Sequence, residues 1–278
     1  MKVEAGQNAI LTGASRGLGT YVARTLAARG VNLVLAARST APLESLAQEL
    51  SSTGIKTHVV TMDMSQEEDV NRLYEESKSV LGDIDYVINN AGIEIIRDYT
   101  NLPVADIRQV LDVNLTGPML LSRLALQDMY ERDSGHIVNI ASAAGKFPPP
   151  FSETYSTTKS GLIAFSQSVR LSARLSGKKV SATAIAPGDM DDAGMYEDMK
   201  EVADTAPWYI GSLPAQAMAD AVIKAIEKDR PVHILMPWSP KLLKVTQVIA
   251  PKLFETISLK MGIFDTLITL AQHRDAQN

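Results

Sequence analysis

Tyr155 and Lys159 are residues whose types and spacing could do acid–base chemistry. They stand four positions apart in a run with helical periodicity, so they share one face of the helix. A neighbouring ammonium favours ionisation of a phenol, whose free pKa is about 10, and moves its proton exchange toward neutral pH. Ser142 follows the apolar run Ile137–Ile140 by two residues and could hydrogen-bond an oxygen atom presented to this pair. Alone, a Tyr-xxx-Lys pair is more often a solvated helix face, so the interpretation depends on the elements that position it.

A glycine-rich turn, Thr12–Gly19, follows the first apolar run of the chain. Its glycines, Gly13, Gly17 and Gly19, would let the chain turn sharply and let a pyrophosphate approach backbone N–H groups at a helix N-terminus. Some such clusters are only tight strand-to-helix turns. The position after the first strand of a βαβ unit favours a dinucleotide site, although the spacing Gly-xxx-Gly-x-Gly differs from the commoner Gly-x-Gly-xx-Gly fingerprint.

Short apolar runs alternate with helical patterns as far as about residue 236, and the runs lack polar alternation, as expected for strands covered on both faces. Leu18, Val22 and Leu26 form one apolar stripe after the first run. The alternation predicts right-handed βαβ crossovers and an α/β fold with one doubly wound, seven-stranded parallel sheet. The expected strands are Asn8–Thr12, Asn32–Ala37, Lys56–Met62, Tyr86–Asn89, His136–Ile140, Lys179–Ala186 and Val232–Met236.

The predicted organisation is a single domain, residues 1–236, followed by a helical extension, residues 237–278. Residues 189–213 depart from the alternation and are expected to form a substrate loop. Two short helices are expected in the extension, starting near Ser239-Pro240 and at Pro251, because proline suits the first helical turn. Gly262 is expected to end the second one.

Composition excludes several function classes. The chain has 278 residues, a net charge of −5 and no cysteine. A nucleic-acid partner requires a basic surface and is not expected. Without cysteine there is no disulfide, no thiolate catalysis and no cysteine-bound metal. No charge-free apolar run reaches the roughly 18 residues of a membrane span, and the first strand begins too early to leave room for a signal peptide. We expect a cytoplasmic protein without a metal site.

Three motifs, taken together, resemble the short-chain dehydrogenase/reductase family. They are Thr-Gly-xxx-Gly-x-Gly at residues 12–19, Asn89-Asn90-Ala91-Gly92 after the fourth expected strand, and Tyr155-xxx-Lys159. The resemblance covers about residues 5–236. It implies a Rossmann-like fold and an enzyme that moves a hydride between a nicotinamide cofactor and the carbonyl carbon of a small organic substrate.

The resemblance also implies roles for the matched residues. Tyr155 would be the general acid/base, Lys159 would tune it and grip the nicotinamide ribose, and Ser142 would orient the carbonyl. Asn114, in the pattern Asp112-Val113-Asn114, would maintain a water relay to the lysine.

The cofactor site would use the glycine turn, the ends of the next three strands and the turn after the sixth. Asp63 would hold the adenine amino group, and Asn90 to Gly92 would lie under the adenosine half. The family usually has a threonine four residues beyond Gly188, where this chain has Asp192, which puts a contact to the nicotinamide carboxamide in doubt. The expected cofactor-binding residues are Gly13, Ser15, Arg16, Gly17, Leu18, Gly19, Arg38, Ser39, Asp63, Asn90, Ala91, Gly92, Tyr155, Lys159, Pro187 and Gly188.

The end of the second expected strand indicates which dinucleotide is bound. An NAD-selective enzyme of this fold usually has a carboxylate there to accept from the ribose 2′-hydroxyl, but this chain has Ala37 followed by Arg38. Arg16, in the glycine turn, is expected to face the same pocket. Two guanidinium groups would bind a 2′-phosphate through charge-assisted bonds, so NADP(H) is the predicted cofactor. The alternative is that both arginines are solvated surface residues.

The substrate is less well defined by the sequence. Phe147 with Pro148–Pro150, the methionines Met190, Met195 and Met199, and Trp208–Ile210 could line an apolar cavity or pack against the tail. Glu94 could approach the pocket or lie in a solvated loop. The favoured activity is reduction of a ketone or 3-oxoacyl compound. The alternatives are an oxidising alcohol or hydroxysteroid dehydrogenase, a membrane-surface lipid ketoreductase, and a non-catalytic NADPH sensor, which would not need all four catalytic residues.

Apolar residues on more than one side of two expected helices indicate self-association. The helices begin near Gly117 and Thr154, and Leu120, Leu121, Leu124 and Leu126 belong to the first. By the resemblance these helices pair across a two-fold axis, so a homodimer or homotetramer is expected. The basic, amphipathic tail could cover the pocket, pack on another subunit or touch a membrane surface.

Overall fold

The computed structural model describes residues 2–190, 212–235, 247, 249–260, 262 and 264–276. Its centre is a seven-stranded sheet in the order β3-β2-β1-β4-β5-β6-β9, and every neighbouring pair is parallel. The strand order reverses between β1 and β4, and ligands of such sheets bind outside the carboxyl ends of the strands at this point. The strands are β1 (Asn8–Thr12), β2 (Asn32–Ala37), β3 (Thr57–Thr61), β4 (Tyr86–Asn89), β5 (Gly135–Ile140), β6 (Val180–Pro187) and β9 (Val232–Leu235).

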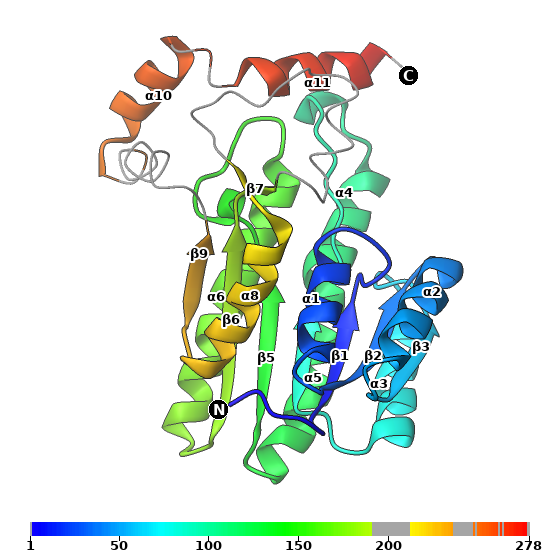
Figure 1. Ribbon diagram of the computed structural model, residues 1–278. Coiled ribbons are helices and arrows are strands. Elements are labelled where there is room, and N and C mark those ends of the chain that lie inside the picture. The colour runs from blue at the N-terminus through cyan, green and yellow to red at the C-terminus, as the bar shows by residue number, and fades with distance from the viewer. Residues whose placement is uncertain are drawn as a thin grey trace.

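Helices cover both faces of the sheet (Figure 1). Successive strand residues point to opposite faces, so Leu11 packs into a core with α1 (Leu18–Ala27), α2 (Thr40–Ser51) and α8 (Ala215–Glu227). Ile10 packs into the core on the other face, whose helices are α3 (Glu67–Leu81), α5 (Gly117–Glu131) and α6 (Glu153–Leu175). The fold is therefore the predicted doubly wound α/β fold.

The predicted strands are confirmed. Three have the predicted bounds, and the other four differ by one residue at one or both ends. The predicted apolar stripe of α1 is buried as well. Helix α3 has Gln66 as its N-cap, and the hydroxyl of the preceding Ser65 donates to Asp63 Oδ1 at 2.8 Å.

Short elements connect the carboxyl ends of the strands to the helices. The 3-10 helix η1 (Tyr99–Asn101) precedes α4 (Val104–Leu111), and the π-helix η2 (Asp112–Thr116) joins α4 to α5. The 3-10 helix η3 (Ala143–Gly145) lies between β5 and α6. Two further strands, β7 (Asp189–Met190) and β8 (Ser212–Leu213), pair in parallel.

The tail contains α10 (Pro251–Lys260) and α11 (Asp265–Ala276). Helix α10 begins at Pro251 as predicted, and Gly262, at a φ of +61°, follows its end. Helix α11 was not predicted; the expected start at Ser239-Pro240 lies outside the described residues. In Figure 1, α11 lies across the carboxyl end of the sheet, above α4. Arg97 Nε contacts Asp275 Oδ1 at 2.8 Å and so anchors α11 to the segment that follows β4.

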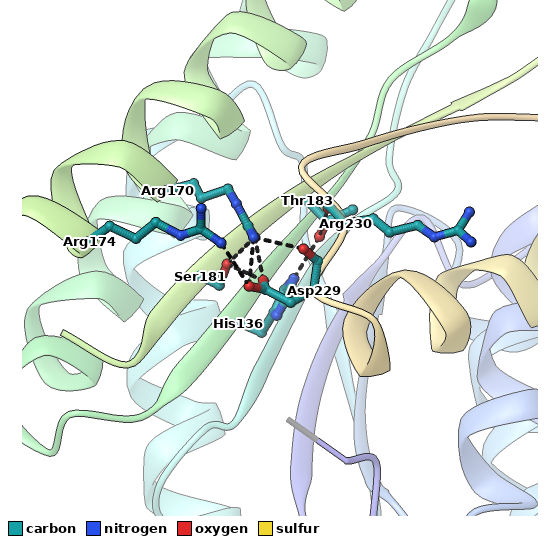
Figure 2. Close-up of polar contacts among 7 residues, drawn as sticks. All are labelled: His136, Arg170, Arg174, Ser181, Thr183, Asp229 and Arg230. Atoms are coloured by element: carbon teal, nitrogen blue, oxygen red, sulfur yellow. Dashed lines mark hydrogen bonds and ion pairs between the residues drawn. The ribbon is translucent and has the colours of Figure 1, made fainter. Parts of the chain in front are cut away.

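At the opposite, amino end of the sheet a polar network joins α6, β6 and the turn before β9 (Figure 2). Arg170 contacts the Asp229 carboxylate with both terminal nitrogens and also donates to Ser181 Oγ. His136 lies beside it and contacts Thr183 Oγ1 at 2.8 Å. The network fixes the turn at Asp229, whose φ is +48°. Among the helices that the structure describes, none is long and apolar enough to cross a membrane.

Candidate active site

The glycine turn and the segment after β4 are held together by hydrogen bonds. Thr12 Oγ1 accepts from the backbone N–H groups of Asn90 and Ala91, both at 3.1 Å. The Asn90 side chain donates back to the carbonyl oxygens of Thr12 and Gly13, at 3.1 and 3.0 Å. Gly13 has a φ of +67°, and a Cβ there would lie 2.8 Å from Ala91 Cα. Only glycine fits this close approach of the two segments.

The beginning of α1 fits the phosphates of a dinucleotide. Gly17 is its N-cap at a φ of +59°, and no side chain caps the helix there. A Cβ on Gly19 would lie 2.1 Å from the Gly13 carbonyl oxygen, so no side chain fits at this position of the turn. Ser15 is half-buried in the turn, and Leu18, the first residue of α1, is buried. Such an N-terminus favours an anion.

Polar residues follow the ends of β2 and β3, where the adenosine half of the cofactor is expected. Arg38 and Ser39 follow β2 and are exposed, as is Arg16 in the glycine turn. Asp63, after β3, is half-buried, and its Oδ1 accepts from the backbone N–H of Ser65 at 2.9 Å. The described residues thus provide two exposed guanidinium groups at this edge and no acidic residue at the end of β2.

Tyr155 and Lys159 lie on the buried face of α6, with exposed fractions of 6% and 3%. Lys159 Nζ is 5.5 Å from the centre of the Tyr155 ring. Nζ donates to the carbonyl oxygen of Ile140, the last residue of β5, at 2.9 Å. Burial lowers the pKa of Lys159 to about 8, and the nearby carboxylate of Glu94 acts in the opposite direction. The pair therefore combines a phenol with a lysine that can change protonation near physiological pH.

Ser142 stands two residues beyond β5 and is half-buried. Its Oγ accepts from the backbone N–H of Ala144 at 3.1 Å, which caps η3. Because the hydroxyl oxygen accepts this bond, its proton remains available for an oxygen atom outside the chain.

Asn114 is fully buried within the π-helix η2. Its Oδ1 accepts from the backbone N–H of Ile93 and its Nδ2 donates to the Ile93 carbonyl oxygen, both at 2.8 Å. Nδ2 also lies 3.3 Å from Thr158 Oγ1 on α6. Asn114 thus joins the segment after β4 to the helix that carries Tyr155 and Lys159, a role in positioning that the sequence did not reveal.

Two further residues enter the site from the loops above it. Glu94 Oε1 accepts from Ser152 Oγ at 2.8 Å, and Ser152 is the buried N-cap of α6. Glu94, expected either to approach the pocket or to lie in a solvated loop, is thus bonded to the start of α6. Ser152 was missed, because a serine ahead of a helix is usually only a cap, whereas here its hydroxyl makes no capping bond.

The residues expected on the nicotinamide side of the site are described in part. Pro187 ends β6 and is buried, and the backbone N–H of Gly188 donates to the Leu235 carbonyl oxygen at 2.7 Å. Met190 packs beside the core, and Phe147 is half-buried. Asp192, Met195, Met199 and the Trp208–Ile210 segment lie outside the described residues. No group of three metal-ligating side chains occurs in the part of the chain that the structure describes.

Comparison with known proteins agrees with this geometry. Residues 7–203 match the family model for short chain dehydrogenases. The chain belongs to the short-chain dehydrogenase/reductase family. The ketoacyl reductase HetN of Nostoc sp. is 34% identical over 275 residues, which cover 97% of this chain and 94% of that protein. The 3-oxoacyl-(acyl-carrier-protein) reductase FabG of Aquifex aeolicus is 34% identical over 70% of this chain and 80% of its own length.

A third relative, the dehydrogenase/reductase SDR family member 7B of Xenopus tropicalis, is 32% identical over 88% of this chain and 82% of its own length. As a member of the short-chain dehydrogenase/reductase family, the protein is an oxidoreductase that binds a nicotinamide cofactor and interconverts CH–OH and carbonyl groups. The matched segment contains the glycine turn and the pair on α6.

Proposed function

We propose that this protein is an NADP(H)-dependent carbonyl reductase for ketones or 3-oxoacyl compounds, and that Asn114, Ser142, Tyr155 and Lys159 form its catalytic tetrad. The observation that carries the proposal is the buried pair on α6: Lys159 Nζ lies 5.5 Å from the Tyr155 ring centre, and burial lowers the pKa of Lys159 to about 8. Two similar proteins are named as ketoacyl and 3-oxoacyl reductases, which supports this substrate class.

In the proposed reaction, the reduced nicotinamide supplies a hydride when it is bound. The Tyr155 phenol donates a proton to the carbonyl oxygen of the substrate, and Ser142 holds that oxygen with the proton its hydroxyl has available. The Lys159 ammonium lowers the cost of the phenolate that remains. Asn114 bonds to both Ile93 and Thr158, and so holds the segment after β4 at a fixed separation from α6.

The preference for NADP(H) rests on Arg16 and Arg38. Both side chains are exposed at the carboxyl edge of the sheet, and Ala37 stands where an NAD-selective enzyme has a carboxylate. A 2′-phosphate would accept charge-assisted hydrogen bonds from both guanidinium groups, each worth about 1.5–3 kcal/mol.

A screen of NADPH and NADH oxidation over ketones, quinones and 3-oxoacyl thioesters tests the proposal. We expect turnover with 3-oxoacyl thioesters or apolar ketones and a lower KM for NADPH than for NADH. Arg38→Asp should weaken NADPH binding and improve NADH binding, because it adds repulsion against phosphate and an acceptor for a ribose hydroxyl. Lys56→Asp, the same charge change at the amino edge of the sheet, is the control. A wild-type preference for NADH would show the 2′-phosphate site to be misplaced.

Exposed apolar side chains support a membrane-surface lipid ketoreductase as the second candidate. On and beside α10, Ile249, Leu253 and Leu259 are 78%, 53% and 76% exposed, and Lys252 and Lys260 are exposed among them. A helix with this mixture can lie in the interface of an anionic bilayer. Sedimentation with anionic vesicles, with and without residues 237–278, separates this candidate from the first. Failure of the full chain to sediment would remove it.

We further propose that the chain forms a homodimer or homotetramer through α5 and α6. Met119 on α5 is 40% exposed, and Leu171 and Leu175 on α6 are 59% and 90% exposed. Burial of these side chains by a second copy would remove apolar surface from water. Light scattering at micromolar concentration tests this, and a monomer would contradict it. The cytoplasmic location stays a prediction from the sequence.

A further inference from the structure

We propose that Glu94 is a positioning residue of the candidate active site, whose carboxylate, held by Ser152 at the start of α6, balances the buried positive charge of Lys159. The inference rests on the proposed function, because Lys159 matters for turnover only if Tyr155 exchanges a proton with a substrate. Three steps lead to it: the backbone that carries Glu94 is fixed, its side chain is held, and its charge acts on Lys159.

The backbone on either side of Glu94 is tied to the site. Gly92 lies against the lysine, since a Cβ there would be 3.2 Å from Lys159 Nζ. Ile93 is held at both its N–H and its carbonyl oxygen by the buried Asn114 amide, at 2.8 Å each. The backbone of Glu94 is therefore held in place, two residues after the Gly92 that lies against Lys159.

The Glu94 carboxylate is held at the beginning of α6. Oε1 accepts from Ser152 Oγ at 2.8 Å, and Ser152 is 1% exposed. Ser152 is one helical turn before Tyr155, and its carbonyl oxygen accepts from the backbone N–H of Ser156 at 2.8 Å. A carboxylate at the N-terminus of a long helix is stabilised by the helix dipole. The Glu94–Ser152 bond thus fixes the carboxylate near the first turn of the helix that carries the reacting pair.

The charge of Glu94 acts on a lysine with few other charged neighbours among the described residues. Near Nζ, α6 itself contributes the Tyr155 ring, β5 contributes the carbonyl oxygen of Ile140, and the segment after β4 contributes the uncharged Gly92. Burial lowers the pKa of Lys159, and Glu94 is the carboxylate that raises it. Without this charge the ammonium would lose its proton at a lower pH, and the phenolate of Tyr155 would lose its counter-charge within the working range.

A titration of Lys159 by NMR, in protein labelled with 13C at the lysine Cε, tests the inference without cofactor or substrate. The Lys159 signal is assigned by its absence in Lys159→Arg. Glu94→Gln keeps an acceptor for Ser152 but removes the charge, and should lower the Lys159 midpoint by about one unit. Ser152→Ala keeps the charge but releases the carboxylate, and should lower the midpoint by a smaller amount. Glu153→Gln removes an exposed carboxylate one residue further along and should leave the midpoint unchanged.

The pH profile of kcat for NADPH-dependent reduction is the second readout. In Glu94→Gln its basic limb should move to lower pH by the same amount as the NMR midpoint, a shift that a purely structural role would not produce. If Glu94→Gln does not fold, Ser152→Ala carries the test. A single charged contact is taken to be worth about one pKa unit. A folded Glu94→Gln or Ser152→Ala variant whose Lys159 midpoint stays within about 0.2 pH units of wild type would therefore overturn the inference. A shifted midpoint in a protein that reduces no carbonyl substrate would uphold the role of Glu94 and refute the proposed function instead.

Discussion

Helix α6 buries a basic side chain near each of its ends, and the two are paired very differently. Near its start, Lys159 donates to one backbone carbonyl oxygen and has its charge balanced only at a distance. Near its end, Arg170 is 5% exposed and contacts the Asp229 carboxylate, the Asp229 carbonyl oxygen at 2.7 Å and Ser181 Oγ at 2.6 Å (Figure 2). One helix thus carries an incompletely paired cation and a fully paired one.

The difference in pairing separates reactivity from stability. Burial opposes the ionised form of Asp229, but hydrogen bonds from Arg170 and Ser181 outweigh it and lower the pKa of Asp229 to about 2. That carboxylate stays ionised at any pH at which the protein works. Lys159 has a pKa near 8 and can exchange its proton there. A buried charge with its full set of partners is inert, whereas one with few partners is costly to the fold and useful to chemistry.

The largest effect is expected at the reactive end. Tyr155→Phe removes the phenolic proton and leaves the ring in place, so kcat should fall by about 10²–10⁴-fold while the free energy of unfolding changes little. Steady-state reduction assays with urea unfolding in parallel measure both, and NADPH binding by fluorescence is the control. Near-normal turnover at saturating NADPH would refute the assignment of Tyr155 as the general acid.

At Arg170, near the end of α6, a substitution should lower stability and leave kcat little changed. Arg170→Met removes the buried partner of Ser181 and of Asp229, whose side chain is 40% exposed and keeps its contacts with Arg174 and Ser181. Losing these charge-assisted hydrogen bonds should cost about 1.5–3 kcal/mol of unfolding free energy. The kcat of the folded fraction should stay near wild type, since the network lies at the amino ends of β5, β6 and β9, whereas Lys159 contacts Ile140 at the carboxyl end of β5. Loss of kcat without loss of stability would mean that the two ends of α6 are coupled.

The two ends should also affect stability in different pH ranges. Burial lowers the pKa of His136, in the paired network, to about 4 from 6.5. The unfolded chain then binds more protons than the folded one between these values, so stability should fall by about 1–3 kcal/mol as pH drops from 6.5 to 4. Urea unfolding at a series of pH values measures the slope, and His136→Gln should flatten it.

Lys159 should make stability depend on pH in the alkaline range, as His136 does in the acid range. Its pKa is lowered from 10.5 to about 8, so the unfolded chain binds the extra proton between pH 8 and 10.5 and stability should rise with pH there. Lys159→Met should flatten this rise and leave the acid range unchanged. A variant that altered both ranges would show that the two ends do not titrate independently.

The smallest effect is expected from the second arginine on Asp229. Arg174 Nη2 is 3.2 Å from Asp229 Oδ2, but its side chain is 58% exposed, in contrast to 6% for Arg170. An exposed pair of this kind contributes about 0–1 kcal/mol. Arg174→Ala should therefore change the free energy of unfolding by less than a third of the Arg170→Met effect. An equal loss from both variants would show that total charge, and not burial, stabilises the turn.

The sequence predicted those features that depend on neighbouring residues. Apolar runs identified all seven strands of the sheet to within one residue, and the four-residue spacing placed Tyr155 and Lys159 on one helix face. The glycine turn was likewise recognisable, because its tight geometry restricts which residues can occupy it.

Contacts between distant residues were missed, because no local pattern encodes them. The bonds that join Asn114 to Ile93 and Glu94 to Ser152 span 21 and 58 residues. Arg170, one of several polar residues on α6, gives no sign in the sequence that it is buried against Asp229. Helix α11 has little apolar periodicity, and the few apolar residues that hold it, Leu270 and Ala271, become recognisable only once Ile96 is beside them.

The anchoring of α11 by Arg97 has a consequence for the order in which the protein matures. Asp275 follows Arg97 by 178 residues. At a synthesis rate of roughly 5–20 residues per second, it leaves the ribosome on the order of ten to forty seconds later. The glycine turn and the segment after β4 are both synthesised before this interval begins. The sheet itself is complete in sequence only at Leu235, the end of β9. A ribosome that stalls between residues 235 and 265 would therefore hold a chain that contains all seven strands of the sheet, Tyr155 and Lys159, but that lacks the contact between α11 and Arg97.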